Sequence, residues 1–201
     1  MTTFTVTLQP TLALTDEQFE QVTRDNPDLK FERTATGELL IMAPTGGETG
    51  NRNFKLYGPF WAYDPQEQSG YFFDSSTAFK LPNSAIRSPD VSWVRRDRWE
   101  VLTPEQKRRF PPLCPDFALE LRSASDGLKS LQDKMQEYLD NDLRLGWLID
   151  PQAQRVEIYR PGQAVEILES PIALSGEEVL QGFVLDLRPI FTLSRGENPW
   201  D

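Results

Sequence analysis

Two acidic residues, Asp90 and Glu120, have the surroundings expected of a metal-binding pair. Asp90 follows a proline and opens an apolar segment at 91–94, and Glu120 lies within the alternating segment 116–122. Carboxylates are preferred ligands of Mg²⁺ and Mn²⁺, which favour oxygen donors. If the two segments are neighbouring strands, both carboxylates can hold one cation. The competing interpretation is that Asp90 is a turn or cap residue, a common role for aspartate after proline.

Cationic and amide side chains close to Glu120 in the sequence are candidate partners of this pair. Glu120 and Arg122 are two residues apart, so they share one face of a strand. In the helix predicted after them, Lys134 lies at the margin of the apolar stripe and Gln132 lies within it, where its amide needs a hydrogen-bond partner. The charged residues also have structural interpretations. Glu120 and Arg122 can form an ion pair at a sheet margin, and Lys134 can extend its alkyl stem over the edge of the core.

The composition excludes several kinds of active site. The 201 residues include no histidine, which excludes Ser-His-Asp and Cys-His relays, a histidine general base and histidine metal ligands. The single cysteine, Cys114, excludes an intrachain disulfide and a multi-cysteine zinc or iron–sulfur site. The formal charge of −10 opposes non-specific binding to nucleic acid, although basic residues bracket the segment 95–109 and could form a local basic surface.

Hydropathy indicates a globular protein outside the membrane. Hydrophobic residues make up 38% of the sequence and charged residues 26%, as in ordinary globular proteins. No apolar run approaches the roughly 18 residues that cross a bilayer. The N-terminal residues show no basic region followed by an apolar stretch, so they do not match a signal peptide. We therefore expect a cytoplasmic protein with no membrane partner.

The elements that must position the candidate residues follow from periodicity. Helices are expected at 15–23 and 49–63, and a third begins after a cap at Ser125-Asp126 and ends near Asn141. Strands are expected at 30–33, 38–43, 71–73, 77–81, 91–94, 116–122, 145–149, 156–159, 165–168 and 182–187. The strand–helix–strand order over 116–149 implies a crossover connection in a central sheet, and therefore an α/β (α+β) fold. The charged segment 95–110 is helix-like and can lie outside the sheet.

Four ordered sequence blocks carry a family resemblance. They are SPDVSWV at 88–94, PDFALELRS at 115–123, LQDKMQEY at 131–138 and LGWLIDP at 145–151, and the segment 37–47 adds a fifth match. In this order they resemble the Uma2 family, once called DUF820, whose members are restriction-endonuclease-like proteins abundant in cyanobacteria. The resemblance extends from about Thr15 to Leu187.

This resemblance implies the fold of the PD-(D/E)XK nucleases. That fold is a restriction-endonuclease-like mixed β-sheet flanked by helices, here with additional β-hairpins. We expect a single domain over residues 1–201. Its parts are an N-terminal helix and strands at 15–43, a nuclease core at about 47–160, and C-terminal strands at 165–190.

The resemblance also implies a metal site. Asp90 and Glu120 match the two acids of the family, and together with the Leu121 carbonyl they are expected to bind Mg²⁺ or Mn²⁺. Glu48, at the start of the helix that follows the Pro-Thr-Gly turn, is a candidate further ligand. Its alternative role is a favourable negative charge at a helix N-terminus.

The lysine of the family motif is replaced in this chain. Arg122 occupies its place, and an arginine cannot act as a base at neutral pH but can stabilise charge on a phosphate. Lys134 is positioned to supply the missing ammonium from the helix, and Gln132 is expected to assist. The expected catalytic set therefore comprises Asp90, Glu120, Arg122, Lys134 and Gln132.

These residues predict a metal-dependent endonuclease that hydrolyses phosphodiester bonds in DNA. The alternative is a catalytically inactive nuclease-like scaffold that acts as a binding module, which the displaced lysine and the acidic charge favour. Hydrolysis of another phosphoester is a third option. A homodimer fits the resemblance as well, because two sites could then cut two strands.

Overall fold

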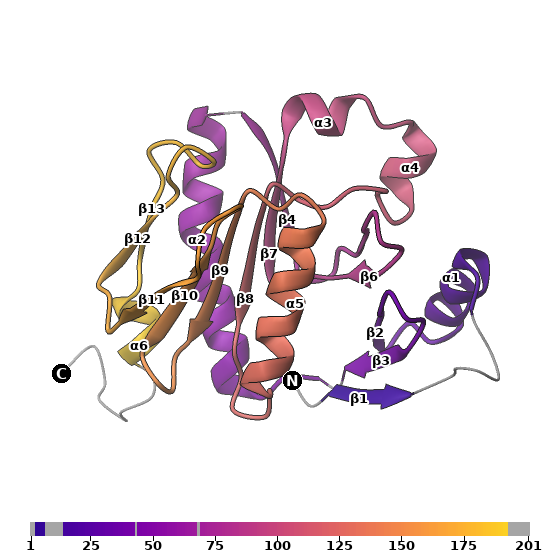
Figure 1. Ribbon diagram of the computed structural model, residues 1–201, viewed down its shortest axis with the longest axis horizontal. Helices are drawn as coiled ribbons and strands as arrows, with labels where there is room; N and C mark the ends of the chain where they lie inside the picture. Colours follow the sequence, from indigo (N-terminus) through magenta and orange to yellow (C-terminus); the bar gives the residue numbers. More distant parts are fainter. Residues whose placement is uncertain (1–2, 7–13, 43, 68, 193–201) are drawn as a thin grey trace.

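The computed structural model, which describes residues 3–6, 14–42, 44–67 and 69–192, shows a mixed α/β fold (Figure 1). A six-stranded central sheet carries helices on both faces. Its strands, in spatial order, are β11 (Glu166–Glu169), β10 (Arg155–Tyr159), β9 (Leu145–Asp150), β8 (Phe117–Leu121), β7 (Val91–Arg95) and β4 (Gly70–Asp74).

Two smaller sheets complete the strands of the described residues. The five-stranded sheet consists, in spatial order, of β1 (Thr3–Val6), β3 (Leu39–Met42), β2 (Lys30–Arg33), β6 (Ile86–Arg87) and β5 (Phe79–Lys80). A two-stranded sheet pairs β12 (Ala173–Ser175) with β13 (Val184–Asp186).

The described residues form six helices. They are α1 (Asp16–Asp25), α2 (Gly47–Glu67), α3 (Arg96–Glu100), α4 (Pro104–Arg108), α5 (Leu128–Asp140) and α6 (Arg188–Phe191). As the sequence predicts, the charged segment between β7 and β8 lies outside the central sheet and forms α3 and α4 (Figure 1). No helix among the described residues is both long and apolar enough to span a membrane.

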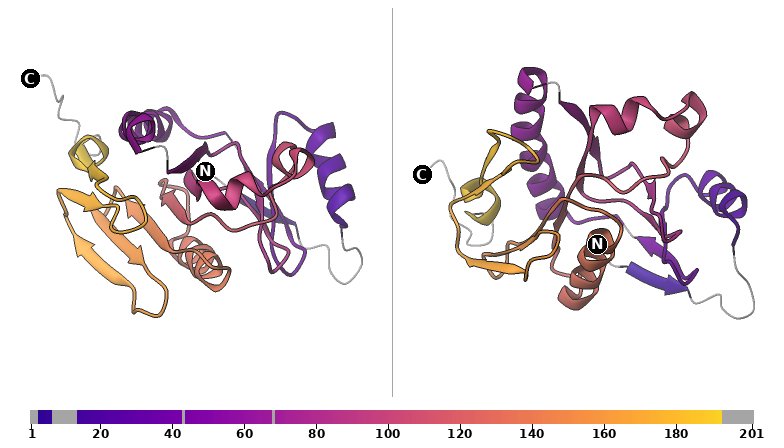
Figure 2. Two further views of the ribbon diagram at one scale, coloured as in Figure 1. Left: turned by 90° about the horizontal axis from the view of Figure 1, so that it is seen from above. Right: turned by 45° about the horizontal axis from the view of Figure 1, so that its top comes forward.

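The alternating sequence of β8 gives the central sheet two different faces. Phe117, Leu119 and Leu121 point toward α2, where they join the larger apolar core. Ala118 points toward α5 and packs in the second core, and Glu120 projects to the same side. Figure 2, seen from above, places α2 and α5 on opposite sides of the strands. A carboxylate is therefore presented to α5 from the centre of the sheet.

The crossover connection expected around Glu120 is confirmed. Strands β8 and β9 pair in parallel, with Phe117 opposite Leu145 and Leu121 opposite Ile149, and α5 connects them. Neighbouring strands that run in parallel need such a crossover, because a tight turn would make the second strand run antiparallel to the first. Every residue of β9 is buried, as expected for a strand covered on both faces.

The five-stranded sheet also separates an apolar face from a polar one. Phe31 in β2 packs with Phe19 of α1 and Ile86 of β6. Lys30 and Glu32 alternate with Phe31, so they point to the other side of the sheet, where they line a cavity. The N-terminus of α1 is fixed by a capping box, in which Thr15 and Gln18 satisfy each other's backbone N–H groups.

Three details differ from the sequence prediction. The N-cap of α5 is Gly127, because the Asp126 carboxylate instead accepts hydrogen bonds from the backbone and hydroxyl of Ser123 at 2.9 and 2.7 Å. Strands β1, β6 and β12 and helix α6 were not predicted, since segments of two to four residues give little periodic signal. Ala43, expected at the end of β3, lies outside the described residues.

Candidate active site

Asp90 and Glu120 meet where two strands of the central sheet end their pairing. Strands β7 and β8 are antiparallel neighbours, and their register places Val91 opposite Leu119 at the last paired position. Asp90 and Glu120 come next, on the same face, because directly opposed residues of antiparallel strands share a face. The Asp90 carboxylate accepts a hydrogen bond from the Leu121 N–H at 2.8 Å. The predicted adjacency of the two acid-bearing strands is confirmed.

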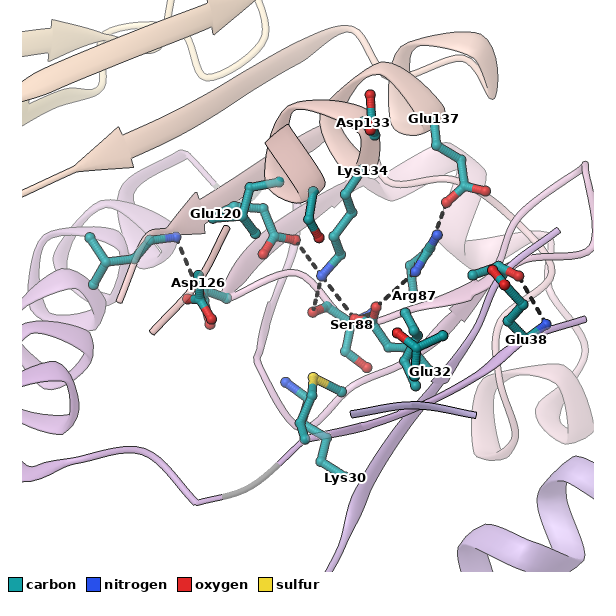
Figure 3. A pocket seen from close by; sticks show the side chains of 18 of the residues that line it. Lys30, Glu32, Glu38, Arg87, Ser88, Glu120, Asp126, Asp133, Lys134 and Glu137 are labelled. Carbon is teal, nitrogen blue, oxygen red and sulfur yellow. Dashed lines mark hydrogen bonds and ion pairs between the residues drawn. The ribbon is translucent and has the colours of Figure 1, made fainter. Parts of the chain in front are cut away.

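The two acids line a cavity of about 420 Å³ between the central sheet and the five-stranded sheet. Helix α5 forms one wall, strands β2 and β3 form another, and α2 contributes Thr49 and Asn53. Figure 3 shows charged side chains that line the cavity. Ten charged residues line it, of which three are basic (Lys30, Arg87 and Lys134) and seven are acidic (Glu32, Glu38, Asp90, Glu120, Asp126, Asp133 and Glu137). The excess of carboxylates makes the cavity more attractive to a cation than to an anion.

Lys134 reaches from α5 to the Glu120 carboxylate, as the sequence suggests. Its Nζ lies 2.8 Å from an oxygen of Glu120 and 2.8 Å from an oxygen of Glu32, and it donates to the Ser88 carbonyl at 3.3 Å (Figure 3). The Tyr138 hydroxyl, one turn along the helix, donates to the same oxygen of Glu120 at 3.1 Å. Both contacts fix the Glu120 side chain in the cavity wall.

Glu32 and Arg87 also line the cavity, and the sequence patterns do not predict them there. Glu32, only 2% exposed, accepts from the Ser88 N–H at 2.9 Å and pairs with Arg87 at 3.1 Å. Arg87 also pairs with Glu137 of α5, so an uninterrupted chain of charges runs from Glu137 to Glu120. The alternation of β2 is the sequence signal for Glu32, because it places this glutamate on the face of the strand opposite Phe31.

Burial and neighbouring charges set the protonation of these acids differently. Burial raises the pKa of Glu120 to about 7, and the negative charges of Asp90 and Glu32 act in the same direction against the ammonium of Lys134. Burial also raises the pKa of Asp90, which its hydrogen bond from Leu121 offsets in part. Burial opposes ionisation of Glu32 too, but Lys134 and Arg87 outweigh it and lower the pKa to about 2.

The raised pKa of Glu120 predicts a pH dependence of stability in metal-free buffer. A carboxyl that binds its proton more tightly when folded destabilises the fold as pH rises from its unfolded pKa, 4.5, through about 7. Full ionisation corresponds to a loss of about 3 kcal/mol. The lowered pKa of Glu32 has the opposite effect on stability, and only below pH 4.5. Ionisation of Glu32 therefore does not change the stability between pH 4.5 and 7.

Chemical denaturation of the wild type and of Glu120→Gln in EDTA, at several pH values from 4.5 to 8, measures this effect. The difference in unfolding free energy between the two proteins should grow with pH in favour of the variant. Parallel pH profiles would show that the carboxyl of Glu120 titrates normally.

The structure does not bring the other expected residues to the cavity. Strand β8 ends at Leu121, so Arg122 leaves the face of Glu120 and pairs with Asp150 at 2.6 Å. Gln132 faces β10 and donates to Glu157 at 2.8 Å, which supplies the partner that its amide was expected to need.

Glu48 points away from the cavity as well. Its side chain is 77% exposed, and its nearest cation is Arg52, one turn along α2, at 3.8 Å. The cavity-lining side chains of α2 are Thr49 and Asn53 instead.

The donors around Asp90 and Glu120 fit a hydrated divalent cation. In the described ranges no three His, Cys, Asp or Glu side chains are grouped as a protein-only metal site would require. Mg²⁺, however, is usually held by one or two carboxylates and keeps several waters. The amide oxygen of Asn53 is buried, lines the cavity and has no hydrogen-bond partner among the described residues, so it can accept from a metal-bound water.

Comparisons with known proteins show the family and the fold of the chain. Residues 16–188 match the model of the Uma2 family, whose description is "Putative restriction endonuclease". A crystal structure described as "a putative nuclease belonging to DUF820 from Anabaena variabilis ATCC 29413" superposes with a TM-score of 0.72 at 19% sequence identity. The match covers 89% of this chain and 98% of that one, and it confirms the predicted fold. No curated protein matches the sequence.

Proposed function

We propose that this chain, which belongs to the Uma2 family, is a metal-dependent endonuclease that hydrolyses phosphodiester bonds in DNA. The observation that carries the proposal is the convergence of Asp90, Glu120 and Lys134 on one cavity, at the point where β7 and β8 stop pairing. Two carboxylates can hold the divalent ion of a metal-assisted phosphoryl transfer, and an ammonium can stabilise the charge that develops on the phosphate.

In this proposal Asp90 and Glu120 hold a Mg²⁺ or Mn²⁺ ion, with the backbone of Leu121 beside them. A divalent ion bound there would activate water and neutralise charge on the scissile phosphate. Asp90 is oriented by the Leu121 N–H and Glu120 by the Tyr138 hydroxyl, so both carboxylates are preorganised before a ligand enters.

Lys134 is the proposed electrostatic catalyst. Its ammonium is held between Glu120 and Glu32, and both carboxylates outweigh the effect of burial and raise its pKa, so it stays protonated. A protonated lysine cannot take a proton from water, but it can stabilise negative charge that develops on the phosphate. Arg122 and Gln132 have other partners in the structure and are left out of the proposed mechanism.

Metal binding is the most direct test of the proposed site. We expect calorimetric titration with Mg²⁺ or Mn²⁺ to show binding by the wild type, and Asp90→Asn to weaken it by at least about tenfold because one of two anionic ligands is lost. Asp133→Asn is the matched control, since Asp133 lines the same cavity but is largely exposed on α5. Equal affinity in all three proteins would contradict the assignment of Asp90.

One observation favours a non-catalytic alternative. Lys134 already makes two ion pairs, and seven carboxylates line the cavity, which would repel a phosphate in the absence of a cation. A protein that binds no metal at millimolar concentration, and cleaves no DNA, would therefore be a nuclease-like scaffold. A homodimer, if light scattering detects one, would present two cavities to a DNA duplex.

A further inference from the structure

Two of the three basic side chains that line the active-site cavity are already neutralised. Arg87 pairs with Glu32 and Glu137, and Lys134 pairs with Glu32 and Glu120. Each of these cations therefore faces two carboxylates. An incoming phosphate must compete with those carboxylates for either cation, which weakens both as anchors of a substrate.

Lys30 is the third cation, and it is different. Within the described part of the chain its ammonium forms no hydrogen bond or ion pair, although its side chain is partly buried in the cavity wall. A partly buried lysine ordinarily finds an acidic partner, because desolvating an ammonium costs free energy. Burial and the nearby charge of Lys134 lower the pKa of Lys30, and the charges of Asp90, Glu32 and Glu120 oppose this shift without outweighing it.

The backbone around Lys30 holds its side chain at a defined place. Strand β2 lies between β3 and β6, with Lys30 opposite Met42 and Arg33 opposite Ile86. Lys30 and Glu32 lie on the same face, so Lys30 enters the cavity from the five-stranded sheet while Glu120 enters it from the central sheet. Figure 3 shows the Lys30 side chain extending into the cavity from the side opposite Lys134.

We propose that Lys30 is a substrate-binding residue whose ammonium contacts a non-bridging oxygen of the phosphodiester held at Asp90 and Glu120. This inference rests on the proposed nuclease function and adds a residue that binds the substrate. The substrate group is an anion, and among the described lining residues Lys30 is the basic side chain that no hydrogen bond or ion pair engages, although the charges of Asp90, Glu32 and Glu120 act on it. The five-stranded sheet is then part of the substrate site and not only a support for α1.

The test compares Lys30→Gln with Lys30→Arg and with Lys129→Gln. Lys129 is the matched control, because its side chain is 81% exposed on α5 and its removal changes the net charge by the same amount. Steady-state cleavage of DNA is measured in Mg²⁺, and binding of a fluorescein-labelled DNA duplex is measured in Ca²⁺ at several salt concentrations. Thermal melting of each variant checks folding, which Lys30→Gln should preserve because Lys30 holds no partner in place.

We expect Lys30→Gln to lower kcat/KM about tenfold or more, chiefly by raising KM, because a charge-assisted contact to the substrate is lost. The slope of log affinity against log salt should become shallower by about one, the signature of one missing phosphate contact. Lys30→Arg should restore most of the affinity, and Lys129→Gln should behave as the wild type. A structural role for Lys30 would change melting but not the salt slope.

The outcomes separate this inference from the nuclease proposal. If the wild type cleaves DNA and Lys30→Gln matches Lys129→Gln in KM and in salt slope, the role of Lys30 is wrong and the nuclease function stands. If the wild type cleaves nothing, the nuclease function is wrong, and the binding assay alone decides about Lys30. Unchanged affinity in Lys30→Gln, or no DNA binding by the wild type, then overturns it.

Discussion

Glu120→Gln is expected to remove metal-dependent DNA cleavage, with a loss of at least about a thousandfold in rate. The substitution keeps the size of the side chain and an oxygen that can accept from the Tyr138 hydroxyl. It removes one of the two negative charges that would hold the cation beside Asp90. The measurement is single-turnover cleavage of DNA in Mg²⁺ and in Mn²⁺, with the protein in excess.

The same substitution should not destabilise the metal-free protein at neutral pH. Because burial raises the pKa of Glu120 to about 7, the carboxylate is costly to ionise in the fold, and an amide avoids that cost. Activity and stability are therefore expected to change in opposite directions. That combination distinguishes loss of a functional group from loss of folded protein.

Glu157→Gln is the matched control for Glu120→Gln. Glu157 is 3% exposed on β10 of the same sheet, and it accepts from Gln132 and from the Tyr159 hydroxyl. Removing its charge perturbs a buried glutamate away from the cavity, so cleavage should continue at the wild-type rate. A Glu120→Gln protein that cleaves as fast as Glu157→Gln would show that the acid pair has been misassigned.

The acid pair was accessible from sequence because local patterns define it. The alternation of 116–122 sets the face of Glu120, and the apolar segment after Asp90 marks the start of a neighbouring strand. The angular position of Lys134 placed it at the margin of the helix stripe, and the family resemblance supplied the expectation that it serves the site, where it pairs with Glu120. Each inference uses a period of two or of 3.6 residues, which the backbone geometry fixes.

The residues that were missed belong to another sheet. Lys30, Glu32 and Arg87 come from strands of four and two residues, and only the tertiary placement of the five-stranded sheet brings them to the cavity. No local period encodes that placement. Arg122 was misplaced for a related reason: its face follows from alternation only while the strand continues, and β8 ends one residue earlier.

Lys134→Met is expected to destabilise the protein strongly. Glu32 and Glu120 would remain buried without the ammonium that lies 2.8 Å from each. Breaking a buried ion pair by removing one partner costs about 3–5 kcal/mol, because the remaining charge is left unpaired. The cost should be greatest at neutral pH and shrink as the acids become protonated below it. Urea denaturation at several pH values measures both effects.

Loss of cleavage by Lys134→Met alone does not establish a catalytic role, because the ammonium also neutralises Glu32. Combining it with Glu32→Gln separates the two roles, since the double variant has the net charge of the wild type and leaves only Glu120 without the ammonium. If Lys134 stabilises charge on the phosphate, the double variant regains much of its stability and still fails to cleave DNA. If Lys134 only compensates Glu32, stability and cleavage return together, and the proposed electrostatic catalyst has to be sought elsewhere in the cavity.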